Sequence, residues 1–156
     1  MTRSEGCLAV GRVPAEATFA LRQQVLRPQQ SRAEMALPGD NDPGTVFLAA
    51  FGASHEVLST LRLQPATCPW FPGRTDAWQL RGMATAEQHR GRGLGGVLVA
   101  AAVRHIAERG GGLLWCNARV PAETFYARAG FTATDQRWDD PAIGPHVGMT
   151  QEVPAE

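Results

Sequence analysis

The sequence contains little of what marks several large classes of protein. Only three of its 156 residues are cysteine, namely Cys7, Cys68 and Cys116. They form no Cys-x-x-Cys pair and stand at none of the His/Cys spacings of a metal site, so neither a disulfide framework nor a bound metal is expected. Buried, reduced thiols in a cytoplasmic protein are favoured instead. No partner residue marks any of the three as a catalytic nucleophile.

Neither sign of charge is in excess. Fifteen basic residues balance fifteen acidic ones, so no global field would draw the chain to nucleic acid or to an anionic membrane. No apolar run approaches transmembrane length, and residues 1–6 lack the apolar core of a signal peptide. Apolar residues make up 44% of the chain, enough for a core without covalent staples. We expect one cytoplasmic domain over residues 1–156, with no nucleic-acid or membrane partner.

The most informative segment is a glycine-rich loop that leads directly into an apolar helix, predicted over Val97–Ala107. Glycine lets a backbone turn sharply, so that several N–H groups can face outward together. The helix adds its unpaired N-terminal N–H groups and the positive end of its dipole. The pattern predicts a receptor for a phosphate or pyrophosphate, formed by Arg90, Gly91, Arg92, Gly93, Leu94, Gly95 and Gly96. The two arginines either reach the phosphates or are solvated loop residues.

The rest of the chain predicts a mixed α/β domain whose phosphate loop lies on a strand-to-helix crossover. Apolar runs bounded by glycine and proline indicate strands, and i, i+3, i+4 spacing indicates helices. The expected strands are Cys7–Val13, Thr45–Phe51, Val57–Leu63, Ala77–Thr85, Leu113–Ala118, Phe131–Trp138 and His146–Val153. The expected helices are Pro14–Leu26, Val97–Ala107 and Pro121–Ala129.

Three of these segments together resemble the GNAT superfamily of N-acetyltransferases. Residues 90–95, Arg-Gly-Arg-Gly-Leu-Gly, fit its R/Q-x-x-G-x-G/A signature, and Leu80–Thr85 resembles its fourth strand. Phe125–Phe131, with Tyr126 and Gly130, is similar to the end of its fourth helix. The resemblance extends from about Leu8 to Val153. It implies a central, mostly antiparallel, twisted sheet of about seven strands, flanked by helices and splayed between the fourth and fifth strands.

The resemblance also implies a use of acetyl-CoA and a role for each matching residue. Backbone groups of Met83 and Thr85, with Ala84 between them, would bind pantetheine, and N–H groups of Gly91–Gly96 would hold the pyrophosphate. Tyr126 would be the general acid that protonates the departing thiolate. The alternative for Tyr126 is a half-buried packing residue with its hydroxyl at the surface.

The sequence departs from the family pattern at two places. Residues 77–85 contain no carboxylate, although relatives often carry a glutamate base on this strand. Either a water chain or His146 would then accept the proton of the attacking amine, unless His146 is purely structural. Many relatives also place an asparagine at the start of the fourth helix, whereas here Asn117 lies upstream within the strand. Asn117 either takes over the contact to pantetheine or satisfies its amide locally.

These observations predict an enzyme that transfers acetyl from acetyl-CoA to a primary amine, most simply of a small molecule, by direct attack. The missing strand carboxylate supports an alternative, a binding module that senses acyl-CoA and transfers nothing, and Tyr126 argues against it. A weaker alternative, nucleic-acid contact through the Arg-Gly segment, conflicts with the zero net charge. A homodimer through the last two strands is a further expectation of the resemblance.

The acceptor itself would be recognised by Leu26, Arg27, Pro28, Arg62, Trp70 and Phe71, with Asp40 and Asp42 attracting a cationic amine. Each of these has an ordinary alternative: a turn, an outward strand charge, or aromatics covering the core.

Overall fold

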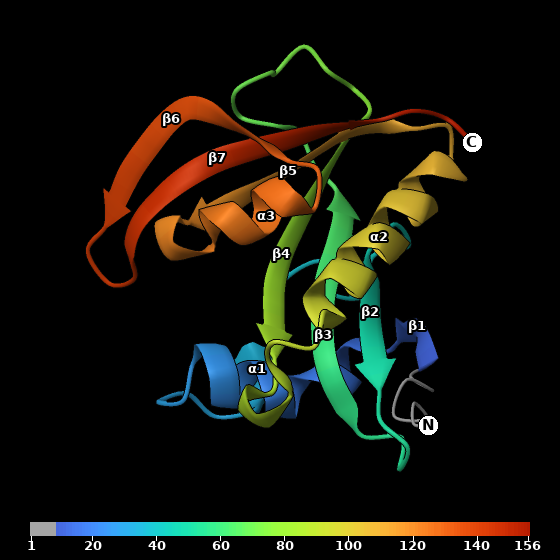
Figure 1. Ribbon diagram of the computed structural model, residues 1–156, viewed down its shortest axis with the longest axis vertical. Coiled ribbons are helices and arrows are strands. Elements are labelled where there is room, and N and C mark those ends of the chain that lie inside the picture. Colours follow the sequence, from blue (N-terminus) through green and yellow to red (C-terminus); the bar gives the residue numbers. More distant parts are fainter. Residues whose placement is uncertain (1–8) are drawn as a thin grey trace. The chain divides into compact units, whose positions relative to one another are not determined.

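The computed structural model describes residues 9–156, and Cys7 therefore lies outside the described residues. Its seven strands form one sheet in the order β1-β2-β3-β4-β5-β7-β6 (Figure 1). β4 and β5 are parallel, whereas the pairs β1–β2, β2–β3, β5–β7 and β6–β7 are antiparallel. This confirms the predicted mixed sheet. The strands are β1 (Ala9–Val13), β2 (Val46–Phe51), β3 (Val57–Pro65), β4 (Ala77–Thr85), β5 (Gly112–Arg119), β6 (Thr132–Asp140) and β7 (Gly144–Val153).

Two helices, α1 and α3, are shorter than predicted because a 3-10 turn occupies their first residues, whereas α2 is longer than predicted. The α-helices are α1 (Phe19–Leu26), α2 (Leu94–Ala107) and α3 (Glu123–Arg128). The 3-10 turns are η2 (Ala15–Thr18), η3 (Ala33–Met35), η4 (Glu87–His89) and η5 (Val120–Ala122). Before α1, the Thr18 hydroxyl donates to the Ala15 carbonyl at 2.7 Å, which stabilises the tighter turn. None of the described helices has the length and apolar character needed to cross a membrane.

The chain divides into two compact units, which we describe separately. The first unit comprises the residues up to Gln64 together with Gly82–Ala102, and the second comprises Pro65–Arg81 together with Val103–Glu156. In the first unit, β1, β2 and β3 form an antiparallel meander. Residues 46–50 of β2 are all buried, so both faces of this strand are covered. A continuous apolar run is what such a strand requires.

The second unit is organised around β5, whose residues 112–116 are buried. β7 pairs with β5 along its whole length, from Gly112↔Val153 to Arg119↔His146. The parallel ladder between β4 and β5 joins only Ala77–Gln79 to Leu113–Trp115, so in the described sheet Leu80–Thr85 extend beyond it. Helix α3 packs against β5 and β6 (Figure 1). The unit therefore presents one sheet face to α3 and the other away from it.

Candidate active site

The end of β4 in the first unit is held by the hydroxyl group of Ser59 on β3. Gly82 interrupts the strand with φ +64°, a conformation that disfavours any residue with a Cβ. Beyond it, the Ser59 hydroxyl donates to the Ala84 carbonyl at 3.2 Å and lies 2.8 Å from the Thr85 hydroxyl. Ala84 is buried, whereas Met83 is half-buried. The segment predicted to meet pantetheine is therefore rigidly anchored from one side.

The glycine loop follows β4 after the short turn η4, and its glycines border open space. Gly91 and Gly93 take φ +80° and +81°, and a Cβ built on either would meet nothing within 4 Å. The first bond of α2 runs from Val97 N–H to the Gly93 carbonyl at 3.1 Å, so the N–H groups before Val97 lie at the helix start without an intrahelical acceptor. The helix therefore begins at Leu94, three residues earlier than predicted. This arrangement provides backbone donors and a positive dipole end for an anion.

The side chains of the loop have different environments. Leu94 is only 2% exposed and fixes the start of α2 in the core. Arg90 donates from Nε to the Thr85 carbonyl at 3.3 Å, which closes the turn after β4. Arg92 is exposed, with Nη1 3.4 Å from Nδ1 of His89. Arg90 thus has a local structural role, and Arg92 extends from the rim of the loop.

Tyr126 lies in the second unit, on the side of α3 that faces β5. It is 9% exposed, and its ring meets Phe125 and Phe131 edge-on, with centroids 5.0 and 5.4 Å away. Burial raises the pKa of its phenol, the nearby Cys116 raises it further, and Arg119 opposes both. Among residues 9–156, no group forms a hydrogen bond with the hydroxyl, although this oxygen is not fully enclosed. The phenol is protonated near neutral pH and is open to an external partner.

His146 is the first residue of β7 that pairs with β5, and it lies on the opposite face of this ladder from Tyr126. It is 8% exposed, and its ring stacks on Trp138 with centroids 5.5 Å apart and planes 11° apart. Nδ1 lies 2.8 Å from the Gly144 carbonyl. Asn117 is exposed and pairs with Gly148, two registers from the pair of Arg119 and His146. Because residues directly opposite each other share a face, Asn117, Arg119 and His146 lie on one face.

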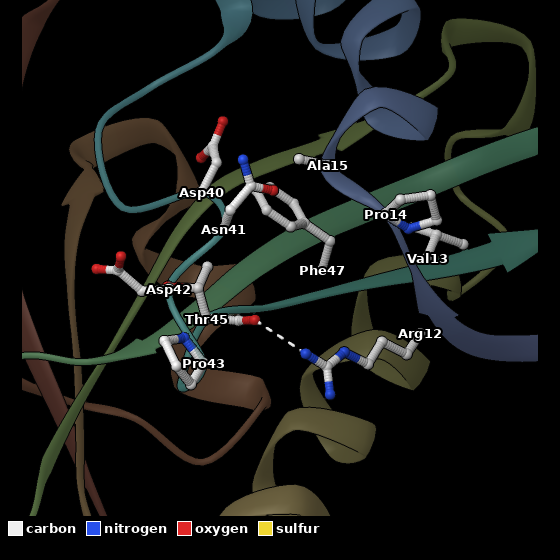
Figure 2. A pocket seen from close by; sticks show the side chains of 10 residues that line it. All are labelled: Arg12, Val13, Pro14, Ala15, Asp40, Asn41, Asp42, Pro43, Thr45 and Phe47. Atoms are coloured by element: carbon white, nitrogen blue, oxygen red, sulfur yellow. Dashed lines mark hydrogen bonds between the residues drawn. The ribbon is translucent and has the colours of Figure 1, made fainter.

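A pocket of about 420 Å³ lies in the first unit between β1 and the loop before β2 (Figure 2). Phe47 contributes an aromatic wall, and Arg12 donates to the Thr45 carbonyl at 3.2 Å. Asp42, one of the two predicted attractors of a cationic amine, is exposed here. The lining residues are Arg12, Val13, Pro14, Ala15, Asp40, Asn41, Asp42, Pro43, Thr45 and Phe47.

Asp40 and Arg62 are not available to an acceptor, because they bind each other. Nη1 of Arg62 lies 3.2 Å from Oδ1 of Asp40, and these side chains are 3% and 6% exposed. Arg62 also donates to the Pro38 carbonyl, and Asp40 accepts from the Leu37 N–H at 2.9 Å. The interpretation of Arg62 as an outward strand charge is therefore wrong. The pair anchors the loop after η3 to β3.

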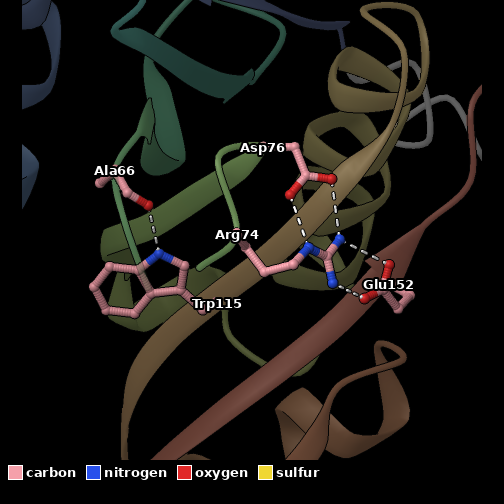
Figure 3. A network of polar contacts seen from close by, with 5 residues as sticks. All are labelled: Ala66, Arg74, Asp76, Trp115 and Glu152. Atoms are coloured by element: carbon pink, nitrogen blue, oxygen red, sulfur yellow. Dashed lines mark hydrogen bonds and ion pairs between the residues drawn. The ribbon is translucent and has the colours of Figure 1, made fainter. Parts of the chain in front are cut away.

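The two aromatic residues predicted to meet the acceptor lie on the loop before β4, which is fastened to the sheet of the second unit. Arg74 is bonded to the carboxylates of Asp76 and Glu152, and these bonds raise its pKa and lower theirs (Figure 3). Trp115 Nε1 donates to the Ala66 carbonyl at 2.9 Å. Trp70 meets Trp115 edge-on, and Phe71 remains 47% exposed.

Sequence reasoning missed two groups around the predicted site residues. Trp138 was assigned only to a strand, yet it stacks on His146 because the hairpin register pairs these two positions. Cys116 was assigned only to the core, yet it is the neighbour that raises the pKa of Tyr126. The pairing could have been inferred from the sequence, because Trp138 ends one predicted strand and His146 begins the next. A hairpin turn between these strands brings the two residues opposite each other.

The seven-stranded mixed sheet with a glycine loop between β4 and α2 fits the fold that the resemblance implies, and comparisons with known proteins agree. Residues 66–138 match the FR47-like protein family model. The chain is 32% identical over 142 residues to the uncharacterized N-acetyltransferase YitI of Bacillus subtilis (strain 168), covering 91% of this chain and 94% of YitI. The chain therefore belongs to the GNAT family of N-acetyltransferases.

Solved structures share the fold at low sequence identity. An aminoglycoside 6'-N-acetyltransferase complexed with coenzyme A superposes with a TM-score of 0.74 at 12% identity, covering 95% of this chain and 98% of that chain. The ribosomal-protein-S18-alanine N-acetyltransferase from Escherichia coli gives a TM-score of 0.75 at 14% identity, covering 96% of each chain. These two relatives act on acceptors of different kinds by their names, so the fold alone selects no acceptor.

Proposed function

We propose that this N-acetyltransferase moves the acetyl group of acetyl-CoA onto a primary amine of a small molecule. The observation that carries the proposal is the glycine loop of the first unit. Its backbone leaves space around Gly91, Gly93 and Gly96, where an added Cβ would meet nothing within 4 Å. Closely approaching phosphate oxygens need such bare backbone.

Every predicted binding residue except Arg90, which bonds within its own turn, has a role in this proposal. The N–H groups of Gly91–Gly96 bind the pyrophosphate, and Arg92 adds a charge at the rim of the loop. The backbone of Met83, Ala84 and Thr85 pairs with the amides of pantetheine, as an added strand would. Asn117 offers its exposed amide to the same arm. The acceptor is an amine that is cationic in solution, for which Asp42 supplies a carboxylate on the surface of the first unit.

The proposed chemistry is direct attack without an acyl-enzyme. The bound ammonium first loses one proton to water; the neutral amine then adds its lone pair to the thioester carbonyl carbon, the C–S bond breaks, and the sulfur leaves with the bonding electrons. Tyr126 gives its phenolic proton to that sulfur. The surplus proton of the amine passes to His146 or to a water chain. Acid or base catalysis of this kind contributes about 10²–10⁴-fold each.

Thermal unfolding with acetyl-CoA tests the binding half of the proposal, with ATP as a control that carries phosphates but no pantetheine. Ligand at about 100 times its dissociation constant adds about 2.7 kcal/mol to the free energy of unfolding. For a chain of this length, that raises Tm by about 5–10 °C. A rise with acetyl-CoA and none with ATP supports the proposal. An equal rise with both ligands, or no rise with either, contradicts it.

A further inference from the structure

The contacts of His146 within the second unit bear on its proposed role. We infer that Trp138 and the carbonyl of Gly144 are positioning groups that hold His146 with Nε2 unprotonated and open. In this state Nε2 is the atom that accepts the proton of the attacking amine. The inference rests on the proposed function for the identity of that proton donor. The tautomer and the orientation of the ring follow from contacts within the second unit alone.

The tautomer follows from the bond to Gly144. A carbonyl oxygen can only accept a hydrogen bond, so the nitrogen 2.8 Å from it must carry the proton. In a neutral imidazole, a proton on Nδ1 leaves the lone pair on Nε2. Gly144 has φ +115°, a conformation that disfavours a side chain. The turn therefore uses a glycine where its carbonyl must point back toward the histidine two residues later.

The orientation of the ring follows from Trp138. The two rings are stacked with planes only 11° apart, and Trp138 stands directly opposite His146 in the β6–β7 ladder. Trp138 is in turn 6.2 Å from Trp70, centroid to centroid, so its position is braced from the loop before β4. Stacking on Trp138 restricts rotation of the imidazole about its Cβ–Cγ bond. The hydrogen bond from Nδ1 to the Gly144 carbonyl disfavours the orientation in which the ring is flipped by 180°. The histidine thus has one orientation and one tautomer.

Nε2 remains free within this arrangement. Among residues 9–156, no group bonds to Nε2, and this atom is not among the fully enclosed polar atoms, although the residue is only 8% exposed. A structural histidine held by both nitrogens would show the opposite pattern. Arg119 lies directly across the ladder on β5, and Asp140, two positions after Trp138 on β6, lies on the same face as His146. His146 therefore presents one accessible lone pair on the face that also carries Asn117.

The proton balance of the step is complete with these groups. As the amine nitrogen forms its bond to the carbonyl carbon, its N–H bond breaks and the proton joins the Nε2 lone pair. The imidazolium then has a proton on each nitrogen, and Nδ1 keeps its own proton, hydrogen-bonded to the Gly144 carbonyl. Solvent takes the Nε2 proton after the product leaves. Trp138 does not touch the reacting atoms in this account and acts only through the orientation of His146.

Nitrogen NMR of the protein without ligand is the first test, because it needs no acceptor. We expect the His146 signals, assigned by their loss in His146→Gln, to show a neutral Nδ1–H tautomer. Trp138→Phe keeps a stacking ring and should keep this pattern, whereas Trp138→Ala should give a mixture of tautomers. His55→Gln, at an exposed turn, is the matched control and should leave the signals unchanged. An Nε2–H tautomer in the native protein would overturn the inference.

Kinetics provide the second arm, with acetyl-CoA and a panel of primary amines from ethylamine to spermidine. His146→Gln should lower kcat by about 10²-fold or more, and Trp138→Ala by about 10-fold, with the KM for acetyl-CoA unchanged. Trp138→Phe should retain most of the activity. The pH dependence of kcat on its acidic side should disappear in His146→Gln. An unchanged kcat and pH profile in that variant would overturn the inference, even if acetyl-CoA binding supports the proposed function. If native protein binds no acetyl-CoA, the proposed function fails, and the tautomer result still decides the positioning of His146.

Discussion

Tyr126 and His146 lie on opposite faces of the ladder formed by β5 and β7. Tyr126 is on α3, beside Cys116 of β5, whereas His146 pairs with Arg119 of β5. Positions 116 and 119 are three apart, an odd number, so their side chains point to opposite faces of the strand. The proposed acid and base would therefore act on the departing sulfur and on the amine from different sides.

Replacement of Tyr126 by phenylalanine should lower kcat by about 10²-fold, with the dissociation constant of acetyl-CoA unchanged. The ring contacts to Phe125 and Phe131 survive the change, so only the proton donor is lost. Steady-state kinetics and the ligand-induced rise of Tm measure the two quantities. Equal turnover in the variant and the native protein would remove Tyr126 from the mechanism.

Substitutions in the glycine loop should separate backbone conformation from side-chain bulk. Gly93→Ala places a Cβ at φ +81° and costs about 1–2 kcal/mol if that conformation is kept. We expect acetyl-CoA affinity to fall by about 10-fold or more, measured by calorimetry.

Gly96→Ala is the matched control, because Gly96 lies inside α2 with open space around it. That change should stabilise the helix by about 0.5–1 kcal/mol. It should also reduce acetyl-CoA affinity less than Gly93→Ala does. A Gly96→Ala variant that loses affinity as strongly would contradict binding through the turned backbone of Gly93.

The Cys116 thiol should make the fold sensitive to alkaline pH. Burial raises its pKa from 9.0 to about 12, so the unfolded chain loses the thiol proton first as pH rises. The free energy of unfolding is therefore unaffected below about pH 8 and falls at higher pH, by about 2 kcal/mol between about pH 8.5 and 10.5. Denaturant unfolding should show a smaller decline over this range in Cys116→Ala. The same slope in both proteins would contradict this source of the pH dependence.

Gly148→Ala should disturb the aromatic residues next to His146. A Cβ at this position would lie 2.5 Å from the Trp70 ring, which must then move. We expect a loss of about 1–3 kcal/mol in the free energy of unfolding and a changed near-UV circular dichroism spectrum. Gly73→Ala, where a Cβ meets nothing within 4 Å, is the control. An unaltered spectrum in Gly148→Ala would mean that Trp70 is not packed on this glycine.

Most elements of the fold could be predicted because strong local signals bound them. The strand Ala77–Thr85 was predicted with the bounds that the structure has, since a proline-rich loop precedes it and the glycine loop follows. The start of α2 was predicted late because Gly95 and Gly96 are poor helix formers, yet Leu94 is anchored in the core. Local propensity here gives way to tertiary packing.

The site was harder to predict where it depends on pairing between distant segments. The ion pair between Asp40 and Arg62 joins a loop to a strand. The spacing of these two residues in the sequence does not indicate that they pair. The stack of Trp138 on His146 depends on the register of a hairpin whose ladder is interrupted between Ala133 and Arg137. Such an irregularity shifts which residues face each other, and periodicity alone does not place it.

The measurement that tests the central claim most directly is amine-dependent release of coenzyme A, coupled to mass spectrometry of the acceptor. The chain contains no lysine, so its own side chains offer no competing primary amine. Native protein incubated with acetyl-CoA and the amine panel should release free thiol and form acetylated amine in equal amounts, and Tyr126→Phe should slow both together. Thiol release without acetylated amine, or no release although acetyl-CoA binds, would contradict acetyl transfer to a small-molecule amine.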